Sequence, residues 1–287
     1  MWMQRVHTYG RLIKFSHTIF ALPFALASVL LAHREHPVGW ATLGWIIVAM
    51  AGARSAAMGF NRLVDYHVDI KNPRTASRPL TAGLIDKRSV LLLIMISSAA
   101  FVLSAYQLGT LCFILSFPVL LVLLSYSYAK RYTMYCHLLL GFGIGLAPLG
   151  AWVAVTGALD ARILLMALAL MTYIAGFDIL YACQDVDFDR QQSLFSIPSR
   201  LGIQPALTIS SLLHVLTSAS LLTLAWAFQL GWAYLAFLAV ISAILVAEHR
   251  MVTPDRLENI PFAFFHLNSV VSVLLFLAVL VDGWASR

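Results

Sequence analysis

Two short acidic stretches stand out in this chain because their side chains recur at a fixed spacing. In the first stretch Asn61, Asp65 and Asp69 lie four residues apart. In the second stretch Asp185 and Asp189 repeat that spacing. Only 11% of the residues are charged, so carboxylates concentrated in this way indicate a functional site.

The spacing of these carboxylates suits a divalent cation. Carboxylates four residues apart lie about 40° around a helix, close enough to share one ligand or cation. Two such pairs facing one cavity would repel each other without a counter-charge. Mg²⁺ prefers oxygen ligands and usually takes one or two carboxylates together with water and substrate phosphates. The four aspartates therefore predict a Mg²⁺–diphosphate site, with basic side chains binding the remaining phosphate oxygens.

Each acidic stretch also follows a charged residue that lies deeper in an apolar run. Arg54 precedes Asn61 by seven residues and Asp178 precedes Asp185 by seven, so each pair shares a helix face. A charged group within a membrane helix is costly unless it faces a polar cavity and finds a partner. We therefore expect Arg54 to face the site, with a purely structural ion pair as the alternative.

Further basic residues lie near these stretches in the sequence. Lys14, His17 and Thr18 are spaced to share one helix face, as either a cationic wall of an anion site or residues reaching the membrane interface. The loop 71–83 is basic, contains proline and glycine, and directly follows Asp69, which suits a loop that covers an anion. Lys130 and Arg131 end an apolar run, where basic residues are also expected for topology alone.

The elements that position these residues are predicted to be membrane-spanning helices. Hydrophobic residues make up 61% of the chain, whereas soluble domains carry about a quarter charged residues. A helix needs about 20 mostly apolar residues to cross a bilayer. The sequence contains nine such runs, which predict an all-α polytopic membrane protein: 15–32, 41–60, 89–107, 110–129, 137–156, 162–181, 206–228, 231–248 and 262–282.

The distribution of basic residues predicts the orientation of these helices. Fifteen of the 19 Lys and Arg residues fall in alternate connections on one side, which includes the N-terminus. The positive-inside rule places that side in the cytoplasm and, with nine spans, the C-terminus outside. The net charge of +6 thus reflects topology, and we expect no nucleic-acid partner. We expect a multi-pass protein of the cell inner membrane, surrounded by lipid, with its site open to the cytoplasm.

The two acidic stretches indicate an internal repeat. One closes the second predicted helix and the other closes the sixth, and a polar loop follows each on the same side. This pattern predicts two four-helix halves with a ninth helix appended, in one membrane domain covering residues 1–287. The two stretches would then meet across a pseudo-symmetric bundle. The fifth helix contains Gly141, Gly143 and Gly145, which favours close helix packing or a kink.

A metal–diphosphate site in a membrane favours one reaction above others. Metal and basic groups would stabilise the charge on a departing diphosphate, and a dry cavity would protect the allylic carbocation from water. An electron-rich ring can then capture the cation, and a prenyl tail explains the membrane location. Carboxylate pairs alone would also fit a cation transporter, which remains the alternative from another class.

The motifs resemble those of the UbiA family of membrane prenyltransferases, and the likeness runs along almost the whole chain. It is closest to the 4-hydroxybenzoate polyprenyltransferase branch. The residues that carry it are Asn61-x3-Asp65-x3-Asp69, Arg74-Thr-Ala-Ser-Arg78-Pro-Leu, Asp178-x2-Tyr181-x3-Asp185-x3-Asp189, His17-Thr-Ile-Phe-Ala-Leu-Pro23-Phe, Tyr128-x-Lys130-Arg131-x-Thr133 and Ser196-Ile-Pro198-x-Arg200-x-Gly202.

The resemblance implies a role for each site residue. The four motif aspartates would coordinate Mg²⁺, and Asn61 would support the diphosphate. Arg54 would bind the carboxylate of the aromatic acceptor or orient it against Asp178, and Tyr181 would line the cavity. The cations expected on the diphosphate side are Arg74, Arg78, Lys130, Arg131 and Lys14.

Three departures from the family pattern bear on the acceptor rather than on the reaction. Arg62 stands where many relatives have aspartate, Gln184 replaces a lysine of some branches, and Ser193 replaces a common glycine. The expected substrates are polyprenyl diphosphate and an aromatic acid, either 4-hydroxybenzoate or a dihydroxynaphthoate for menaquinone. Haem or chlorophyllide is less well supported because the sequence has no distinctive motif for porphyrin contacts.

Overall fold

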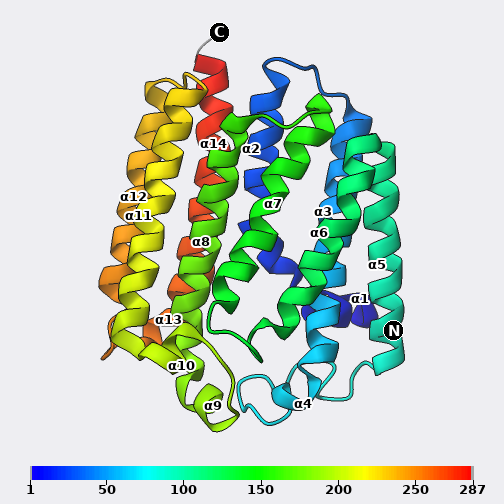
Figure 1. Ribbon diagram of the computed structural model, residues 1–287, viewed down its shortest axis with the longest axis vertical. Coiled ribbons are helices and arrows are strands. Elements are labelled where there is room, and N and C mark those ends of the chain that lie inside the picture. Colours follow the sequence, from blue (N-terminus) through cyan, green and yellow to red (C-terminus); the bar gives the residue numbers. More distant parts are fainter. Residues whose placement is uncertain (1, 286–287) are drawn as a thin grey trace. The chain divides into compact units, whose positions relative to one another are not determined.

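The computed structural model describes residues 2–285, with the side chains of 2–6, 15–17 and 264 left aside, and the described part is helical without strands (Figure 1). Eight helices are long: α3 (Trp40–Val64), α5 (Lys87–Gln107), α6 (Thr110–Ala129), α7 (Cys136–Thr156), α8 (Leu164–Ala182), α11 (Ile203–Ala227), α12 (Trp232–Met251) and α14 (Asn268–Ala285). The shorter α-helices are α1 (Trp2–Leu12), α2 (Leu22–His33), α4 (Tyr66–Asp69), α9 (Val186–Gln191), α10 (Ile197–Leu201) and α13 (Ile260–Phe262). The remaining turns are η1 (Phe15–Phe20), η2 (Ala161–Ile163), η3 (Cys183–Asp185), η4 (Leu257–Asn259) and the π-helical η5 (Ala263–Leu267).

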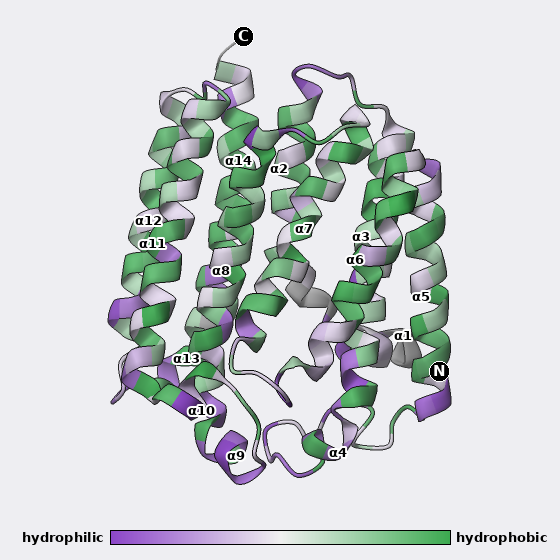
Figure 2. Cartoon of the chain, in the orientation of Figure 1, coloured by the Kyte–Doolittle hydropathy of each residue, from purple (hydrophilic) through white to green (hydrophobic). Residues whose placement is uncertain are grey.

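The helices confirm the predicted class of an all-α membrane protein. Eight stretches of the described residues are long and apolar enough to cross a membrane. They correspond to eight of the nine predicted runs, whereas the run 15–32 forms a shorter apolar helix, Thr18–His33. The count of nine therefore stays a prediction. Hydrophobic residues cover most of the long helices, and hydrophilic ones gather in the short α9 (Figure 2).

The chain forms two compact units, of which the first contains Met1–Thr18 and Gly39–Tyr128. Its main packing joins α3 to α5. Gly52 permits this approach, since a Cβ there would lie 2.8 Å from the carbonyl oxygen of Ser97 on α5. A small core then fastens the end of α1 and the loop after α4 to α5 through Leu12, Leu80, Ile85, Val90 and Ile94.

The second unit contains Ile19–Val38 and Ala129–Arg287 and packs its helices around α8. Gly141 and Gly145 on α7 face α8. A Cβ at Gly145 would lie 2.9 Å from the carbonyl oxygen of Ala167, and one at Gly141 would overlap the carbonyl oxygen of Met171. The close helix packing expected of this glycine-rich helix is therefore present.

Helix α2 belongs to the second unit although it precedes the first unit's long helices in sequence. Ser28 Oγ donates a 2.7 Å hydrogen bond to the carbonyl oxygen of Pro148 on α7. Phe24 stacks on Tyr173 of α8 at 5.8 Å between ring centroids. The compact units therefore do not follow the predicted grouping into four, four and one helices, because these contacts draw α2 to the later helices.

A buried polar cluster joins four helices of the second unit. The Glu248 side chain on α12 accepts a 3.0 Å hydrogen bond from Asn268 Nδ2 on α14, and its other oxygen lies 3.5 Å from His214 Nδ1 on α11. His249 Nε2 lies 3.0 Å from the same nitrogen of His214. Tyr173 on α8 donates a 2.7 Å hydrogen bond to the carbonyl oxygen of Asn268. These polar contacts fix the register of α8, α11, α12 and α14.

Candidate functional site

The first acidic motif lies where a long helix breaks. Helix α3 ends at Val64, and Asp65 has φ −87° and ψ 4°, a conformation that also occurs at other helix ends of this chain, such as Tyr135 and Phe228. The short helix α4 follows at once. The backbone N–H of Asp69 still donates a 2.7 Å hydrogen bond to the carbonyl oxygen of Asp65. The two aspartates therefore keep the one-turn helical relation that their spacing predicts, although the helix breaks between α3 and α4.

Both carboxylates of this motif are held by neighbouring polar groups. Asn61 Nδ2 donates a 2.9 Å hydrogen bond to Asp65 Oδ2, so the asparagine orients the first carboxylate. Asp69 is buried and pairs with Arg78, at 2.5 Å between Nη1 and Oδ2. Arg62 Nη1 lies 3.8 Å from the same oxygen and 3.3 Å from Asn61 Oδ1. Arg62 is a buried cation of this motif that the sequence reasoning set aside.

The basic loop that follows Asp69 is tied back onto the motif. Thr75 Oγ1 donates a 2.9 Å hydrogen bond to the carbonyl oxygen of Asp69, and Thr81 Oγ1 donates one to the carbonyl oxygen of Thr75. Asn72 Oδ1 accepts a hydrogen bond from the backbone N–H of Arg74, whose side chain is exposed. Arg78 therefore contacts the motif in this structure.

Lys14 and Arg54 lie together in the first unit. Arg54 Nη2 donates a 3.4 Å hydrogen bond to the carbonyl oxygen of Lys14, and Arg54 Nε is buried without a hydrogen bond among the described residues. Burial lowers the pKa of Lys14 to about 7, helped by the guanidinium groups of Arg62, Arg78, Arg74 and Arg54 in that order. This concentration of positive charge is suited to an anion.

The predicted helix face of Lys14, His17 and Thr18 does not form. Lys14 lies in the turn between α1 and η1 with φ 48°, so helical spacing does not relate it to the later residues. An additional helix, α1, comes before it. The side chain of His17 lies outside the described part of the chain.

The second acidic motif repeats the backbone break of the first. Helix α8 ends at Ala182 and continues through η3 to Asp185, which has φ −106° and ψ 8° and precedes the short helix α9. Asp189 is buried. Its Oδ1 lies 3.2 Å from Lys130 Nζ, and its Oδ2 accepts a 3.0 Å hydrogen bond from Ser196 Oγ. In both motifs the first aspartate sits at the break and the last one pairs with a cation.

The remaining predicted residues of this unit lie along α8 and beside α7. Asp178 pairs with His137 at the start of α7, at 2.7 Å between Oδ2 and Nδ1. Tyr181 is half-buried and packs against the hydrophobic cluster around Ile179. Arg131 is half-buried next to Lys130, in the turn before α7. The sequence reasoning missed His137 because nothing in the spacing of a single histidine relates it to a carboxylate 41 residues away.

The donor chemistry of the motifs fits Mg²⁺, although no group of three or more His, Cys, Asp or Glu within the described residues could by itself hold a metal. Each motif contains one pair of carboxylates. Mg²⁺ commonly takes only one or two carboxylates and completes its shell with water and substrate phosphates. Asp189 Oδ1 is buried and lies 3.2 Å from Lys130 Nζ, so in this structure a side-chain cation neutralises the oxygen that would bind the metal.

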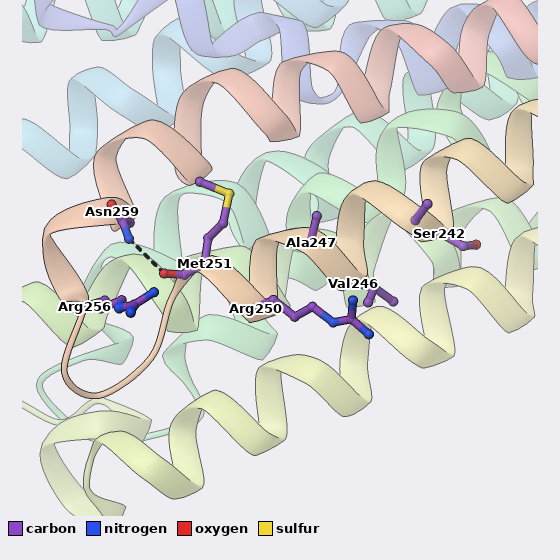
Figure 3. A pocket seen from close by; sticks show the side chains of 8 residues that line it. Ser242, Val246, Ala247, Arg250, Met251, Arg256 and Asn259 are labelled. Carbon is purple, nitrogen blue, oxygen red and sulfur yellow. Dashed lines mark hydrogen bonds between the residues drawn. The ribbon is translucent and has the colours of Figure 1, made fainter.

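A pocket of about 580 Å³ in the second unit lies away from these residues. It is lined by the last turns of α12 and by the following loop, where Asn259 Nδ2 donates a 2.9 Å hydrogen bond to the carbonyl oxygen of Met251 (Figure 3). Arg250 and Arg256 supply its positive charge. None of the predicted site residues lines it, so this pocket is not the candidate site.

Comparison with known proteins defines the class that the fold and the motifs indicate. Residues 21–270 match the UbiA prenyltransferase family. The chain therefore belongs to the UbiA prenyltransferase family and is a membrane prenyltransferase. This agrees with the resemblance seen in the sequence motifs.

Curated relatives are similar at low identity. The chain is 28% identical over 244 residues to a 4-hydroxybenzoate octaprenyltransferase of Saccharophagus degradans, covering 85% of this chain and 81% of that protein. It is 26% identical over 275 residues to the protein of that name in Vibrio parahaemolyticus, covering 96% and 93%. A polyprenyl transferase of Arthrobotrys oligospora is 32% identical over 185 residues, or 63% of this chain, and the match spans about half (47%) of that protein.

Two solved structures share the fold. The apo structure of a UbiA homolog from Aeropyrum pernix K1 has a TM-score of 0.84 and 33% identity, covering 93% of this chain and 98% of that one. A UbiA homolog from Archaeoglobus fulgidus, bound to GPP and Mg²⁺, has a TM-score of 0.71 and 17% identity, covering 96% and 99%. At that identity the second likeness shows the fold alone.

Proposed function

We propose that this prenyltransferase transfers a polyprenyl group from polyprenyl diphosphate to the ring of an aromatic acid, 4-hydroxybenzoate, in quinone biosynthesis. One observation carries the proposal: in each acidic motif, one carboxylate is paired with a basic side chain. These pairs are Asp69 with Arg78 and Asp189 with Lys130. Cations positioned beside metal-binding carboxylates are suited to the phosphate oxygens of a metal-bound diphosphate.

The proposed roles follow from the donor chemistry of each side chain. Bound Mg²⁺ would supply positive charge to the departing diphosphate. The acidic motifs would hold the metal through their carboxylates, and basic side chains would bind the phosphate oxygens beside them. The metal ligands are Asp65, Asp69, Asp185 and Asp189; the phosphate-side cations are Lys14, Arg74, Arg78, Lys130 and Arg131.

The bonds that break and form in the reaction define what the residues around the aromatic acceptor must do. The C1–O bond of the prenyl diphosphate breaks, a bond forms from prenyl C1 to a ring carbon, and that carbon loses its proton. Arg54 has a buried Nε without a hydrogen bond among the described residues, which suits it to the carboxylate of the acceptor. Tyr181 would line the cavity. We place the protein in the cell inner membrane as a single domain, residues 1–287, with the site open to the cytoplasm.

The names of the relatives support the acceptor, and the GPP- and Mg²⁺-bound structure of the Archaeoglobus protein supports the metal–diphosphate chemistry. The direct test incubates membranes containing the protein with a labelled polyprenyl diphosphate and a panel of aromatic acids, followed by mass analysis of the product. We expect prenylated 4-hydroxybenzoate. A product formed only from a dihydroxynaphthoate would replace this acceptor and keep the reaction.

Variants of the motifs test the site separately from the acceptor. We expect Asp65→Ala and Asp185→Ala to abolish Mg²⁺-dependent product formation, because each removes one oxygen ligand from the metal–diphosphate site. Asp255→Ala is the matched control, since Asp255 is an exposed aspartate outside both motifs. Full activity in either motif variant would refute the metal assignment. Cation flux without any prenylated product would instead support a transporter.

A further inference from the structure

One imidazole in the second unit lies between the mid-helix carboxylate and the segment that holds the motif aspartate. His137 is buried, and its Nδ1 lies 2.7 Å from Asp178 Oδ2. Its other nitrogen, Nε2, accepts a 3.4 Å hydrogen bond from the backbone N–H of Ile197. Ile197 directly follows Ser196, whose hydroxyl donates to Asp189. His137 therefore links Asp178 to the backbone that positions Asp189.

The hydrogen bonds of His137 define what Asp178 can do. A backbone N–H can only donate, so His137 Nε2 is an acceptor and the imidazole proton lies on Nδ1, where it is donated to Asp178. Asp178 is then an acceptor with one oxygen already engaged. About a quarter of its side chain, 26%, is exposed, against 4% for His137. The carboxylate thus has surface available to a ligand, whereas the imidazole lies behind it.

The position of Asp178 within a membrane helix limits the kind of ligand. An accessible carboxylate in a membrane-spanning helix faces a polar cavity rather than lipid. An ionised carboxylate accepts hydrogen bonds only, so it repels the carboxylate of an aromatic acid and attracts a hydroxyl group. Of the polar groups on a hydroxylated aromatic acid, only the ring hydroxyl can donate to it.

We propose that Asp178, held by His137, accepts a hydrogen bond from the ring hydroxyl of the aromatic acceptor and so selects hydroxylated rings. The inference rests on the proposed function and names the acceptor contact within it. A hydrogen bond from a phenol to a carboxylate increases electron density on the ring carbon next to the hydroxyl, which is where an allylic cation would add. His137 acts as a positioning residue, because it touches Asp178 and the Ile197 backbone.

The network makes separable predictions for its two ends. Asp178→Leu removes the acceptor and should raise KM for the aromatic acid about 10–100-fold, the size expected for losing one hydrogen bond to a charged group. KM for the prenyl diphosphate should stay within about twofold of wild type. Ser196→Ala is the matched variant at the other end of the network. It should raise KM for the prenyl diphosphate and leave KM for the aromatic acid within about twofold of wild type. His137→Ala should raise both constants.

The variant Asp178→Asn gives a readout that a structural role would not produce. The Nδ1–H of His137 would bind the amide oxygen of the asparagine and leave its NH₂ group facing the ligand. The exposed group would then donate rather than accept. We expect wild type to favour the hydroxyl compound over its methoxy analogue by about 10-fold or more, and Asp178→Asn to remove or reverse that preference.

Direct binding separates this inference from the proposed function. Calorimetry of the purified protein with the hydroxyl and methoxy acids, in the absence of the prenyl donor, measures recognition without turnover. Loss of the hydroxyl preference in Asp178→Asn supports the contact even where no product forms. Equal binding of both acids by the wild-type protein overturns the proposed Asp178 contact. Prenyl transfer observed in the same preparation would then leave the proposed function intact. Thermal unfolding that is unchanged in Asp178→Asn excludes global damage, and His137→Gln supplies a second variant where His137→Ala fails to fold.

Discussion

The contact between α7 and α8 allows a quantitative test of the fold beneath the site. A Cβ at Gly145 would lie 2.9 Å from the carbonyl oxygen of Ala167 and 3.0 Å from the Cβ of Met171. An ordinary contact begins at 3.4 Å, so Gly145→Ala forces the two helices apart by about 0.5 Å, and overpacking of this kind costs about 1–3 kcal/mol. The obstacle is partly backbone, which side-chain rotation cannot remove.

A control on the same helix isolates that cost. A Cβ at Gly150 would meet nothing within 4 Å. Both substitutions gain the same helix propensity, about 1 kcal/mol for Gly to Ala in a helix interior. The difference between Gly145→Ala and Gly150→Ala therefore reports packing alone, and we expect Gly145→Ala to be less stable by about 1–3 kcal/mol.

Thermal unfolding of the two variants in detergent micelles, followed by tryptophan fluorescence, measures this difference. Prenyl transfer should fall as well in Gly145→Ala, because α7 carries His137 and α8 carries its partner Asp178. Gly150→Ala should retain wild-type activity. If the two variants unfold at the same temperature, α7 and α8 do not approach as closely as described, and the reasoning is wrong.

Two further predictions concern buried polar side chains. Burial lowers the pKa of Lys14 to about 7, so the unfolded chain binds one more proton than the folded chain between about pH 7 and pH 10.5. The free energy of unfolding should therefore rise with pH across that window. Lys14→Met should lose this rise, which a comparison of unfolding midpoints at pH 7 and pH 9 measures. Glu248→Leu removes the carboxylate that accepts a hydrogen bond from Asn268 Nδ2 and should destabilise the protein by about 1–3 kcal/mol, the cost of a buried donor that loses its acceptor. Thermal unfolding measures this loss, and a value under about 1 kcal/mol would mean that the cluster does not hold the helices together.

The sequence was sufficient for the helices and for the motif spacing. Apolar runs of about 20 residues are a direct consequence of bilayer thickness, and eight of them form long helices close to the predicted bounds. The sequence spacing also predicts that Asp65 and Asp69 lie one helical turn apart. The hydrogen bond from the backbone N–H of Asp69 to the carbonyl oxygen of Asp65 keeps that relation across the helix break. The break itself was not predicted, since no proline or glycine marks it.

The partners of the charged residues could not be read from the sequence. The sequence marks Arg62 only as a departure from the family pattern, yet its buried side chain lies close to both Asn61 and Asp69. Glu248 and His214 lie in apolar helices that showed no motif, and they meet only because α11 and α12 pack together. A charged residue in a membrane helix predicts a partner, but tertiary packing decides which one.

The predicted internal repeat is present in local backbone geometry rather than in the grouping of helices. Helix α2 packs with the second unit, so the long helices do not divide evenly. Even so, Asp65 and Asp185 have similar backbone conformations, each after a long helix and before a short one. The two motifs therefore share the placement of the first aspartate at a helix break, followed by a short helix that carries the second aspartate.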